Sequence, residues 1–446
     1  MIKQTGICII LMLLINSVYA EQPSQSSTLD NIANSAFARD SQIQVSLRNY
    51  GKYLNDDEMA GNKMVHTAWG QAFAMRYTSG YFADFIGVDG SFVGVVKLGA
   101  SKYFASRSLL WNDGPGFDKH NAKSFNKFDQ RYIKIKLGDD QQINYNAKLG
   151  WQVFDRYGVL RVSNQLSKNT YLGYSGTLGN HNYSLDTLYV TRYIDRDSPQ
   201  KKQFLSENNK HIDHILSAGI NYKTDQLSVA YAFGEADHYM QRHLFDISYK
   251  PIEQLTLGSQ IYINHPLSIY NQMPSSLKAA DGNAWYYAAD VKWQQDDIGI
   301  KFGVAYTKAN KDNGDLGYFK RNVVDNTRWR FDTMTEAAYH YQRDGELALT
   351  LLADYQYHPD FYSAIQINYG QFHYKQNHFK VGEINFINRW TPSDPRLKNL
   401  IVSTMIGKGL TYQNIDNKQP LFYSNGQFKR GSSISGEFII EYQFNL

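Results

Sequence analysis

Side chains that could carry out catalysis are grouped at only a few places in the chain. His211-Ile212-Asp213-His214 comes nearest to a metal-ligand pair, but residues three apart on a strand point to opposite faces. The acidic pairs Asp56-Asp57, Asp139-Asp140 and Asp296-Asp297 could supply an acid and a base, yet adjacent carboxylates are also typical of solvated turns. No G-x-S-x-G nucleophile elbow is present. We therefore expect a protein that is not an enzyme and that needs no metal or other cofactor.

The composition indicates which elements must position the remaining polar side chains. Of the 446 residues, 34 are Tyr, 24 are Phe, 7 are Trp and 33 are Gly, a composition that favours β-sheet. The mean hydropathy of −0.50 excludes a protein made of several membrane-spanning helices. The formal net charge of +4 is too small to suggest a nucleic-acid partner.

The first twenty residues have the pattern of a secretory signal peptide. Lys3 provides the positive charge, Ile7–Ile15 is apolar, and Val18-Tyr19-Ala20 places small residues before a cleavage point at Glu21. The only cysteine, Cys8, lies in this segment, so the exported chain has no disulfide. We expect a signal peptide over 1–20, a lead-in segment over 21–42 and one β-domain over 43–446.

Segments of about ten residues alternate between apolar and polar side chains along the chain. Gln142–Phe154, Leu255–Asn264 and Ile298–Thr307 are clear examples. This pattern is typical either of a soluble sandwich or of the lipid-facing strands of an outer-membrane barrel. Tight turns alternate with longer polar stretches, which favours the barrel, because every second connection then faces the same side of the membrane. The longer stretches are 54–66, 99–127, 155–168, 193–212, 265–282, 308–345 and 408–432.

Counting on this basis predicts an all-β fold: a transmembrane antiparallel barrel of about eighteen strands with inward-folded constriction loops. The last strand has an apolar face that would aggregate as a free edge, and pairing with the first strand removes that edge. The predicted strands are 43–53, 67–77, 88–98, 128–137, 142–154, 169–177, 180–192, 213–222, 226–235, 241–250, 254–264, 283–294, 298–307, 346–356, 361–369, 378–390, 399–407 and 433–446.

A barrel of this width encloses water, so its inward-facing side chains contact the solute. Side chains of both charges occur on the inward face, which suits a neutral polar solute such as a sugar. The inward-facing candidates are Lys134, Lys136, Asn144, Lys148, Gln152, Gln260, Asp290, Lys301, Glu437 and Glu441.

Several segments resemble a known family of channels. Tyr77-Thr78-Ser79-Gly80-Tyr81, followed by Asp84–Asp89, resembles the N-terminal strands of the OprD family of substrate-specific outer-membrane porins. Asp281-Gly282-Asn283-Ala284-Trp285 resembles the D-G-x-A-W segment of the chitoporin branch. Gly317-Tyr318-Phe319 and Arg328–Asp332 are similar to a G-Y-F and an aromatic-acidic segment of the same proteins.

The resemblance implies a passive channel in the outer membrane of a Gram-negative bacterium. Its third and seventh external loops, 155–168 and 308–345, would form the constriction, and chitooligosaccharides or related sugars would be the solutes. The alternative within the family is a channel for amino acids or short peptides, and an outer-membrane hydrolase is a more distant alternative. The expected pore-lining residues are Arg161, Asn164, Gln165, Tyr318, Arg328, Trp329, Arg330, Asp332, Lys134, Lys148 and Asp290.

The predicted location also implies partners. We expect contact with outer-membrane lipid and lipopolysaccharide, recognition by the barrel-insertion machinery, and a monomeric or trimeric assembly, with no nucleic-acid partner.

Overall fold

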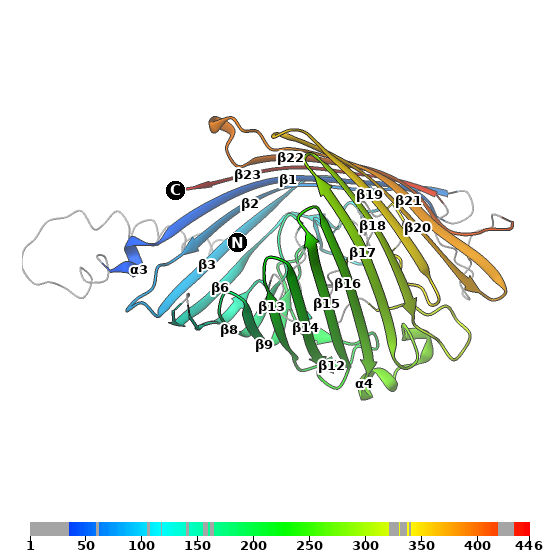
Figure 1. The fold of residues 1–446 in the computed structure, drawn as a ribbon, viewed down its shortest axis with the longest axis horizontal. Coiled ribbons are helices and arrows are strands. Elements are labelled where there is room, and N and C mark those ends of the chain that lie inside the picture. Colours follow the sequence, from blue (N-terminus) through cyan, green and yellow to red (C-terminus); the bar gives the residue numbers. More distant parts are fainter. Residues whose placement is uncertain are drawn as a thin grey trace, which may run out of the picture.

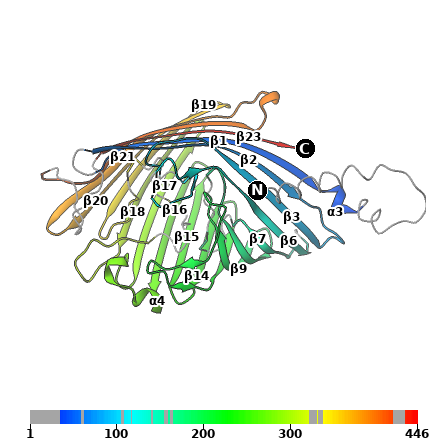
Figure 2. The same cartoon turned by 180° about the vertical axis from the view of Figure 1, so that it is seen from behind.

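The fold is a single antiparallel sheet that closes on itself to form a barrel (Figure 1; Figure 2 shows the opposite side). The computed structural model describes residues 35–58, 62–104, 108–116, 118–139, 142–154, 159–160, 165–320, 330, 337–338, 340–417 and 432–446. Among these residues, no helix is long and apolar enough to cross a membrane.

Eighteen strands form the barrel wall, each paired with its neighbours in chain order. They are β1 (Gln42–Glu58), β2 (Asn62–Thr78), β3 (Ile86–Ala100), β6 (Phe125–Gly138), β7 (Asn144–Gln152), β8 (Thr170–Gly179), β9 (Tyr183–Ile194), β13 (Ile215–Lys223), β14 (Leu227–Ala236), β15 (Met240–Ile252), β16 (Leu255–Pro266), β17 (Ala284–Gln295), β18 (Ile298–Lys308), β19 (Leu347–His358), β20 (Phe361–Tyr374), β21 (Asn377–Trp390), β22 (Leu400–Asn414) and β23 (Ser432–Asn445).

Short elements occupy the segment before β1 and several connections. They are α3 (Ala36–Arg39), β4 (Trp111–Asn112), β5 (Ala122–Lys123), β10 (Lys201–Lys202), β11 (Phe204–Leu205), β12 (His211–Ile212), α4 (Ser268–Asn271), η2 (Ser275–Leu277) and η3 (Pro395–Leu397).

Closure of the barrel depends on the pairing of the first and last strands. β1 and β23 are antiparallel from Gln44 opposite Asn445 to Asp56 opposite Ser433. On the inner side of this seam, Lys52 Nζ lies 3.3 Å from Glu437 Oε1, and both side chains are buried. Because backbone groups find no other hydrogen-bond partners in lipid, this pairing is what allows the sheet to span a membrane.

The two faces of the barrel wall differ in polarity as a membrane requires. Large apolar side chains point outward and stay exposed, such as Leu149 at 60% and Ile220 at 58% of full exposure. Inward-pointing side chains are mostly polar and are covered by one another and by loops, as for Gln152, Gln260 and Asn385. The apolar outer band is the surface that lipid covers.

The predicted strands correspond one to one with the observed barrel strands, so the predicted fold class is correct. The prediction that 54–66 is a long connection is wrong, because β1 runs to Glu58 and β2 starts at Asn62. Asn55, Asp56 and Asp57 look like a turn in the sequence, but their backbone continues the hairpin until Glu58 lies opposite Asn62. The proposed signal peptide lies outside the described residues.

The seam between β1 and β23 generates a testable prediction. A variant lacking Tyr442–Leu446 removes the pairing opposite Gln44–Leu47, which leaves unpaired backbone groups at one edge of the membrane region. We expect the variant to lose the heat-modifiable mobility of a folded barrel on gel electrophoresis. Assembly at wild-type levels in the membrane would contradict the importance of this seam.

Candidate functional site

Loop 3 (153–169) enters the barrel and contacts two distant parts of its inner wall. Val159 N–H donates to Ser217 Oγ on β13 at 3.0 Å. Leu166 lies against β2, where a Cβ atom on Gly70 would approach Leu166 Cδ1 to 2.6 Å. Since β13 is the eighth barrel strand and β2 the second, the described ends of loop 3 reach walls that lie far apart around the lumen.

Loop 7 (309–346) is attached to the inner wall first near β15 and β16. The carbonyl oxygen of Lys320 accepts hydrogen bonds from Arg242 Nη2 and Asn264 Nδ2, each at 2.8 Å. Both donors are buried. The attachment therefore fixes the main chain of the loop, independently of the Lys320 side chain.

A second attachment holds the returning part of loop 7 near the barrel seam. Ala338 N–H donates to Glu383 Oε2 on β21 at 3.1 Å, and Ser433 Oγ on β23 donates to the Ala337 carbonyl. Loop 7 therefore contacts the wall at β15–β16 and again at β21–β23. The described parts of loop 7 therefore lie against the inner face of the barrel at both places.

Between these attachments, Arg330 binds the wall through charged and neutral partners. Its guanidinium donates to Asp246 Oδ1 at 2.7 Å, to Asp290 Oδ1 at 3.0 Å and to Ser248 Oγ at 2.8 Å. Lys301 Nζ donates to the Arg330 carbonyl at 2.7 Å. One cation with two carboxylates in a partly desolvated place makes strong charge-assisted hydrogen bonds, and we call this arrangement the loop 7 clamp.

The loop 7 clamp also requires a residue without a side chain. A Cβ atom on Gly258 of β16 would lie 2.1 Å from Arg330 Nη1 and 2.7 Å from Asp290 Oδ1. Gly258 therefore provides the space in which the guanidinium approaches the wall.

A basic cluster lies on the opposite part of the wall, on β2, β6 and β7. Lys134 and Lys148 are directly opposite one another on β6 and β7, an arrangement that repels. Asp89 neutralises Lys134, with Lys134 Nζ 2.8 Å from Asp89 Oδ1, while Lys148 Nζ lies 5.1 Å from the centre of the Tyr132 ring. Arg76 on β2 interacts electrostatically with Lys148 and hydrogen bonds to Tyr132.

This basic cluster has excess positive charge. Arg76, Lys134 and Lys148 carry three positive charges; Asp89 pairs with Lys134, and Asp129, which pairs with Lys127, also interacts electrostatically with Arg76. Neither Arg76 nor Lys148 forms an ion pair with any residue that the structure describes. The cluster is therefore suited to hold an anionic group that passes through the lumen.

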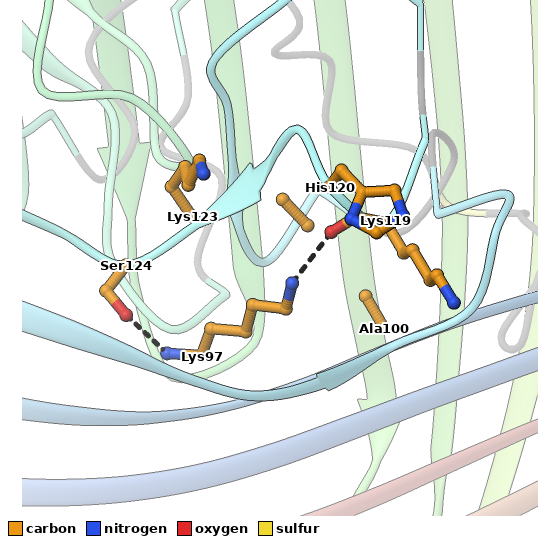
Figure 3. A pocket seen from close by; sticks show the side chains of 7 residues that line it. Lys97, Ala100, Lys119, His120, Lys123 and Ser124 are labelled. Atoms are coloured by element: carbon orange, nitrogen blue, oxygen red, sulfur yellow. Dashed lines mark hydrogen bonds between the residues drawn. The ribbon is translucent and has the colours of Figure 1, made fainter.

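A second group of cations surrounds a pocket between β3 and loop 2 (101–124) (Figure 3). Lys97 Nζ donates to the Lys119 carbonyl at 2.7 Å, and Ser124 Oγ accepts from the Lys97 backbone N–H at 2.9 Å. Lys123 and His120 also line the pocket. Lys97, Lys119 and Lys123 therefore give the lining of this pocket three positive charges.

The predicted pore-lining residues are described only in part. Lys134, Lys148 and Asp290 lie on the inner face of β6, β7 and β17, and their contact with a solute stays a prediction. Arg161, Asn164, Arg328, Trp329 and Asp332 lie outside the described residues, so their roles stay predictions. Gln165 donates from its backbone to the Ser167 carbonyl within loop 3, and Arg330 forms the loop 7 clamp. Tyr318 packs under Arg343, with the guanidinium 5.2 Å from the ring centre, and its N–H bonds to loop 6 at Ala279.

The motifs that carry the chitoporin resemblance have structural contacts here. Asp281 Oδ2 accepts from Asp312 N–H at 3.0 Å, which joins loop 6 (267–283) to loop 7. Phe319 is fully buried against Tyr262 and Tyr286. These segments fix the path of loops 6 and 7, and their presence does not by itself identify a solute.

The sequence reasoning did not single out Arg76, Asp89, Asp246, Ser248 or Gly258. The alternation of side chains along the strands could have identified the polar residues in this group. Asp246, for example, is separated by an even number of residues from the other inward-facing residues of 241–250. For Gly258 no sequence signal existed, because its importance comes from an arginine 72 positions away. No group of three or more potential metal ligands occurs among the described residues.

Glu346, at the end of loop 7, is a buried carboxyl group. Its Oε2 accepts from the Arg343 N–H at 2.8 Å, while Oε1 has no hydrogen-bond partner in the described structure. Burial raises the pKa of Glu346 to about 7. The base of loop 7 is therefore sensitive to pH in the neutral range.

The closed barrel, its apolar outer band and its two inward loops define a membrane diffusion channel. A family model described as "outer membrane porin, OprD family" matches residues 35–358, which is well over half of the chain. The chain belongs to this family of outer-membrane porins, and its location is the Gram-negative outer membrane.

Solved structures of similar channels agree with this fold. OpdK of Pseudomonas aeruginosa has a TM-score of 0.68 at 15% identity, covering 92% of this chain and 99% of that chain. OccAB1 of Acinetobacter baumannii has a TM-score of 0.73 at 15% identity, with 92% and 98% covered. OccK9 (OpdG) of Pseudomonas aeruginosa has a TM-score of 0.71 at 14% identity, with 92% and 100% covered. Among curated proteins, none matches the chain.

The loop 7 clamp can be tested by two substitutions that break it from opposite sides. Arg330→Ala removes the cation, and Gly258→Ala places a methyl group in its position. Charge-assisted hydrogen bonds are each worth roughly 1.5–3 kcal/mol, so the population of displaced loop should rise at least tenfold. We expect larger and noisier single-channel currents in planar bilayers for both variants.

The control is Gly94→Ala on β3, where the nearest atom to the added Cβ lies 3.8 Å away. It should conduct like the wild type, and all three variants should keep the heat-modifiable barrel. Unchanged currents in both clamp variants would show that Arg330 does not position loop 7.

The buried Glu346 predicts how loop 7 responds to pH. The pKa of Glu346 in the folded protein lies above that of an exposed glutamic acid, so the protonated carboxyl group stabilises the folded state. This stabilisation is fully present below about pH 4.5 and is lost as the pH rises through about 7. This difference in pKa corresponds to about 3 kcal/mol of folding free energy. Current fluctuations of the wild type should increase between pH 5 and pH 8. Glu346→Gln, which keeps an acceptor for Arg343 N–H, should show no such increase; the same pH response in both proteins would exclude Glu346 as its source.

Proposed function

We propose that this porin passes small polar solutes that carry a carboxylate group, a class that includes amino acids and short peptides. The observation that carries the proposal is the basic cluster, in which Arg76 and Lys148 make no ion pair with a described residue. A carboxylate in the lumen would find the positive charges of Arg76 and Lys148 at this place, while the Tyr132 hydroxyl donates to Asp89 Oδ2 at 2.7 Å. The cations around the loop 2 pocket have the same sign of charge.

A similar channel offers a precedent for such a solute. One structure with a TM-score of 0.67 and 15% identity is OpdK of Pseudomonas aeruginosa with vanillate, which is an aromatic carboxylate. The identity is too low to transfer that compound to this chain. It supports carboxylates as a class that this barrel architecture can accommodate.

Neutral oligosaccharides, including chitooligosaccharides, are the second candidate. The resemblance of Asp281–Trp285 and Gly317–Phe319 to chitoporins favours them, and polar side chains of both charges line the lumen. Lys52 and Glu437 neutralise each other, and Arg330 and Lys301 together balance Asp246 and Asp290, so part of the wall would present a sugar with paired charges. Binding of a carboxylate would depend on the positive charge of the basic cluster, whereas binding of a neutral oligosaccharide would not.

The test compares Lys148→Gln with Lys292→Gln, which removes one positive charge from the lumen side of β17. Removing a charge a few ångströms from a carboxylate in water costs about 1 kcal/mol, so vanillate should block the Lys148→Gln channel roughly fivefold less tightly. Single-channel block by vanillate and by chitohexaose measures both affinities. Lys292→Gln should retain the vanillate affinity of the wild type.

Two outcomes would contradict the carboxylate proposal. Vanillate block that is equal in the wild type and in Lys148→Gln would show that the basic cluster does not bind the solute. Block by chitohexaose without block by vanillate would establish the oligosaccharide candidate instead.

A further inference from the structure

An unusual group of cations faces outward at the extracellular ends of β6 to β9. Arg131, Trp151, Leu172 and Arg192 are paired in register across these four strands, so their side chains share the outer face. At a strand spacing of about 4.8 Å, the two arginines at the ends of this row have Cα atoms roughly 14 Å apart. Lys201 of β10, in loop 4 (195–214), comes to the same place.

The aromatic ring at the centre of this row holds two of the cations. The Arg131 guanidinium lies 5.1 Å from the centre of the Trp151 ring, and Lys201 Nζ lies 5.8 Å from it. Trp151 is only 6% exposed as a result, although its neighbour Leu149 on the same face is 60% exposed. Cation–π contacts fix the positions of the cations but supply no negative charge, and only Arg131 interacts electrostatically with a described carboxylate, that of Asp129.

None of Arg131, Arg192 and Lys201 forms an ion pair with a described residue. Arg131 Nη1 donates to the Phe128 carbonyl at 2.8 Å, and Arg192 and Lys201 are exposed. The apolar band begins directly below them, since Ile133 on the same face is 43% exposed. Three cations beside a lipid-facing surface are unfavourable unless anions neutralise them.

We propose that Arg131, Arg192 and Lys201 form a binding site for the phosphate groups of lipopolysaccharide in the outer leaflet, which we call the outer cationic site. Guanidinium groups bind phosphate oxygens through two parallel hydrogen bonds, and Trp151 lies at the depth where aromatic side chains meet lipid headgroups. The site faces away from the lumen, so it is independent of the solute that the channel carries.

The experiment uses the purified full-length protein in detergent and titrates it with lipopolysaccharide. The wild type is compared with Arg192→Gln/Lys201→Gln, and the readouts are lipid retention by native mass spectrometry and the midpoint temperature of heat modification. We expect the apparent dissociation constant of lipopolysaccharide to rise at least tenfold in the double variant. Enzymatically dephosphorylated lipopolysaccharide should bind the wild type as weakly as the double variant binds the intact lipid.

The matched control is Lys308→Gln/Lys408→Gln, which removes two outward-facing charges on β18 and β22. It should bind lipopolysaccharide like the wild type. Lys201→Gln alone, in the short β10 outside the eighteen-strand wall, should weaken binding without any effect on assembly, and unchanged conductance verifies the fold of every variant.

Three results would overturn the outer cationic site. Equal affinity in the double variant and the control would show that these cations do not bind the lipid. Equal binding of dephosphorylated lipopolysaccharide would show that phosphate is not recognised. A thermal shift with inorganic phosphate as large as that with the lipid would identify a site for free phosphate and contradict a lipid site.

Discussion

Inside a membrane, every backbone N–H and C=O group needs a hydrogen-bond partner within the protein, and this requirement governs the structure. Eighteen antiparallel strands satisfy it only because β23 pairs with β1 from Gln44 to Asp56. Closure at this strand number leaves a lumen too wide for wall side chains alone to fill, so loops 3 and 7 occupy part of it. The selectivity of the channel therefore follows from how these loops are held against a wall that closure has already fixed.

Charges hold the loops and also set the electrostatic character of the lumen. On one side, Arg330 and Lys301 together balance two carboxylates of β15 and β17, which neutralises the wall where loop 7 contacts it. On the other side, Arg76 and Lys148 have no such partner among the described residues. The lumen thus has a neutral wall that carries a loop and a positive wall that faces it, an arrangement that favours anionic groups near β2 and β7.

The alternation of side chains predicted all eighteen strands and the inward orientation of Lys134, Lys148 and Asp290, because polarity differs so strongly between lipid and lumen. It could not predict which charges pair. The sequence contains both signs, but only the structure shows that Asp89 pairs with Lys134 while Lys148 forms no ion pair with a described residue. Such pairing depends on which strands are neighbours and on how a loop returns, as with Gly258 and Arg330. The polar residues of 54–66 also led to the wrong prediction of a long connection, because β1 and β2 continue there without the alternation of apolar and polar side chains.

Solute uptake into proteoliposomes distinguishes a carboxylate channel from a sugar channel, because it follows the neutral form of a solute as well as its anion. Swelling rates are measured for the wild-type channel with vanillate, with its methyl ester and with N-acetylglucosamine, solutes of comparable size. We expect vanillate to enter several-fold faster than its methyl ester and faster than the sugar, and high salt to reduce this preference by screening the basic cluster. Equal rates for vanillate and its ester, or a preference for the sugar that salt does not change, would contradict a channel selective for carboxylates.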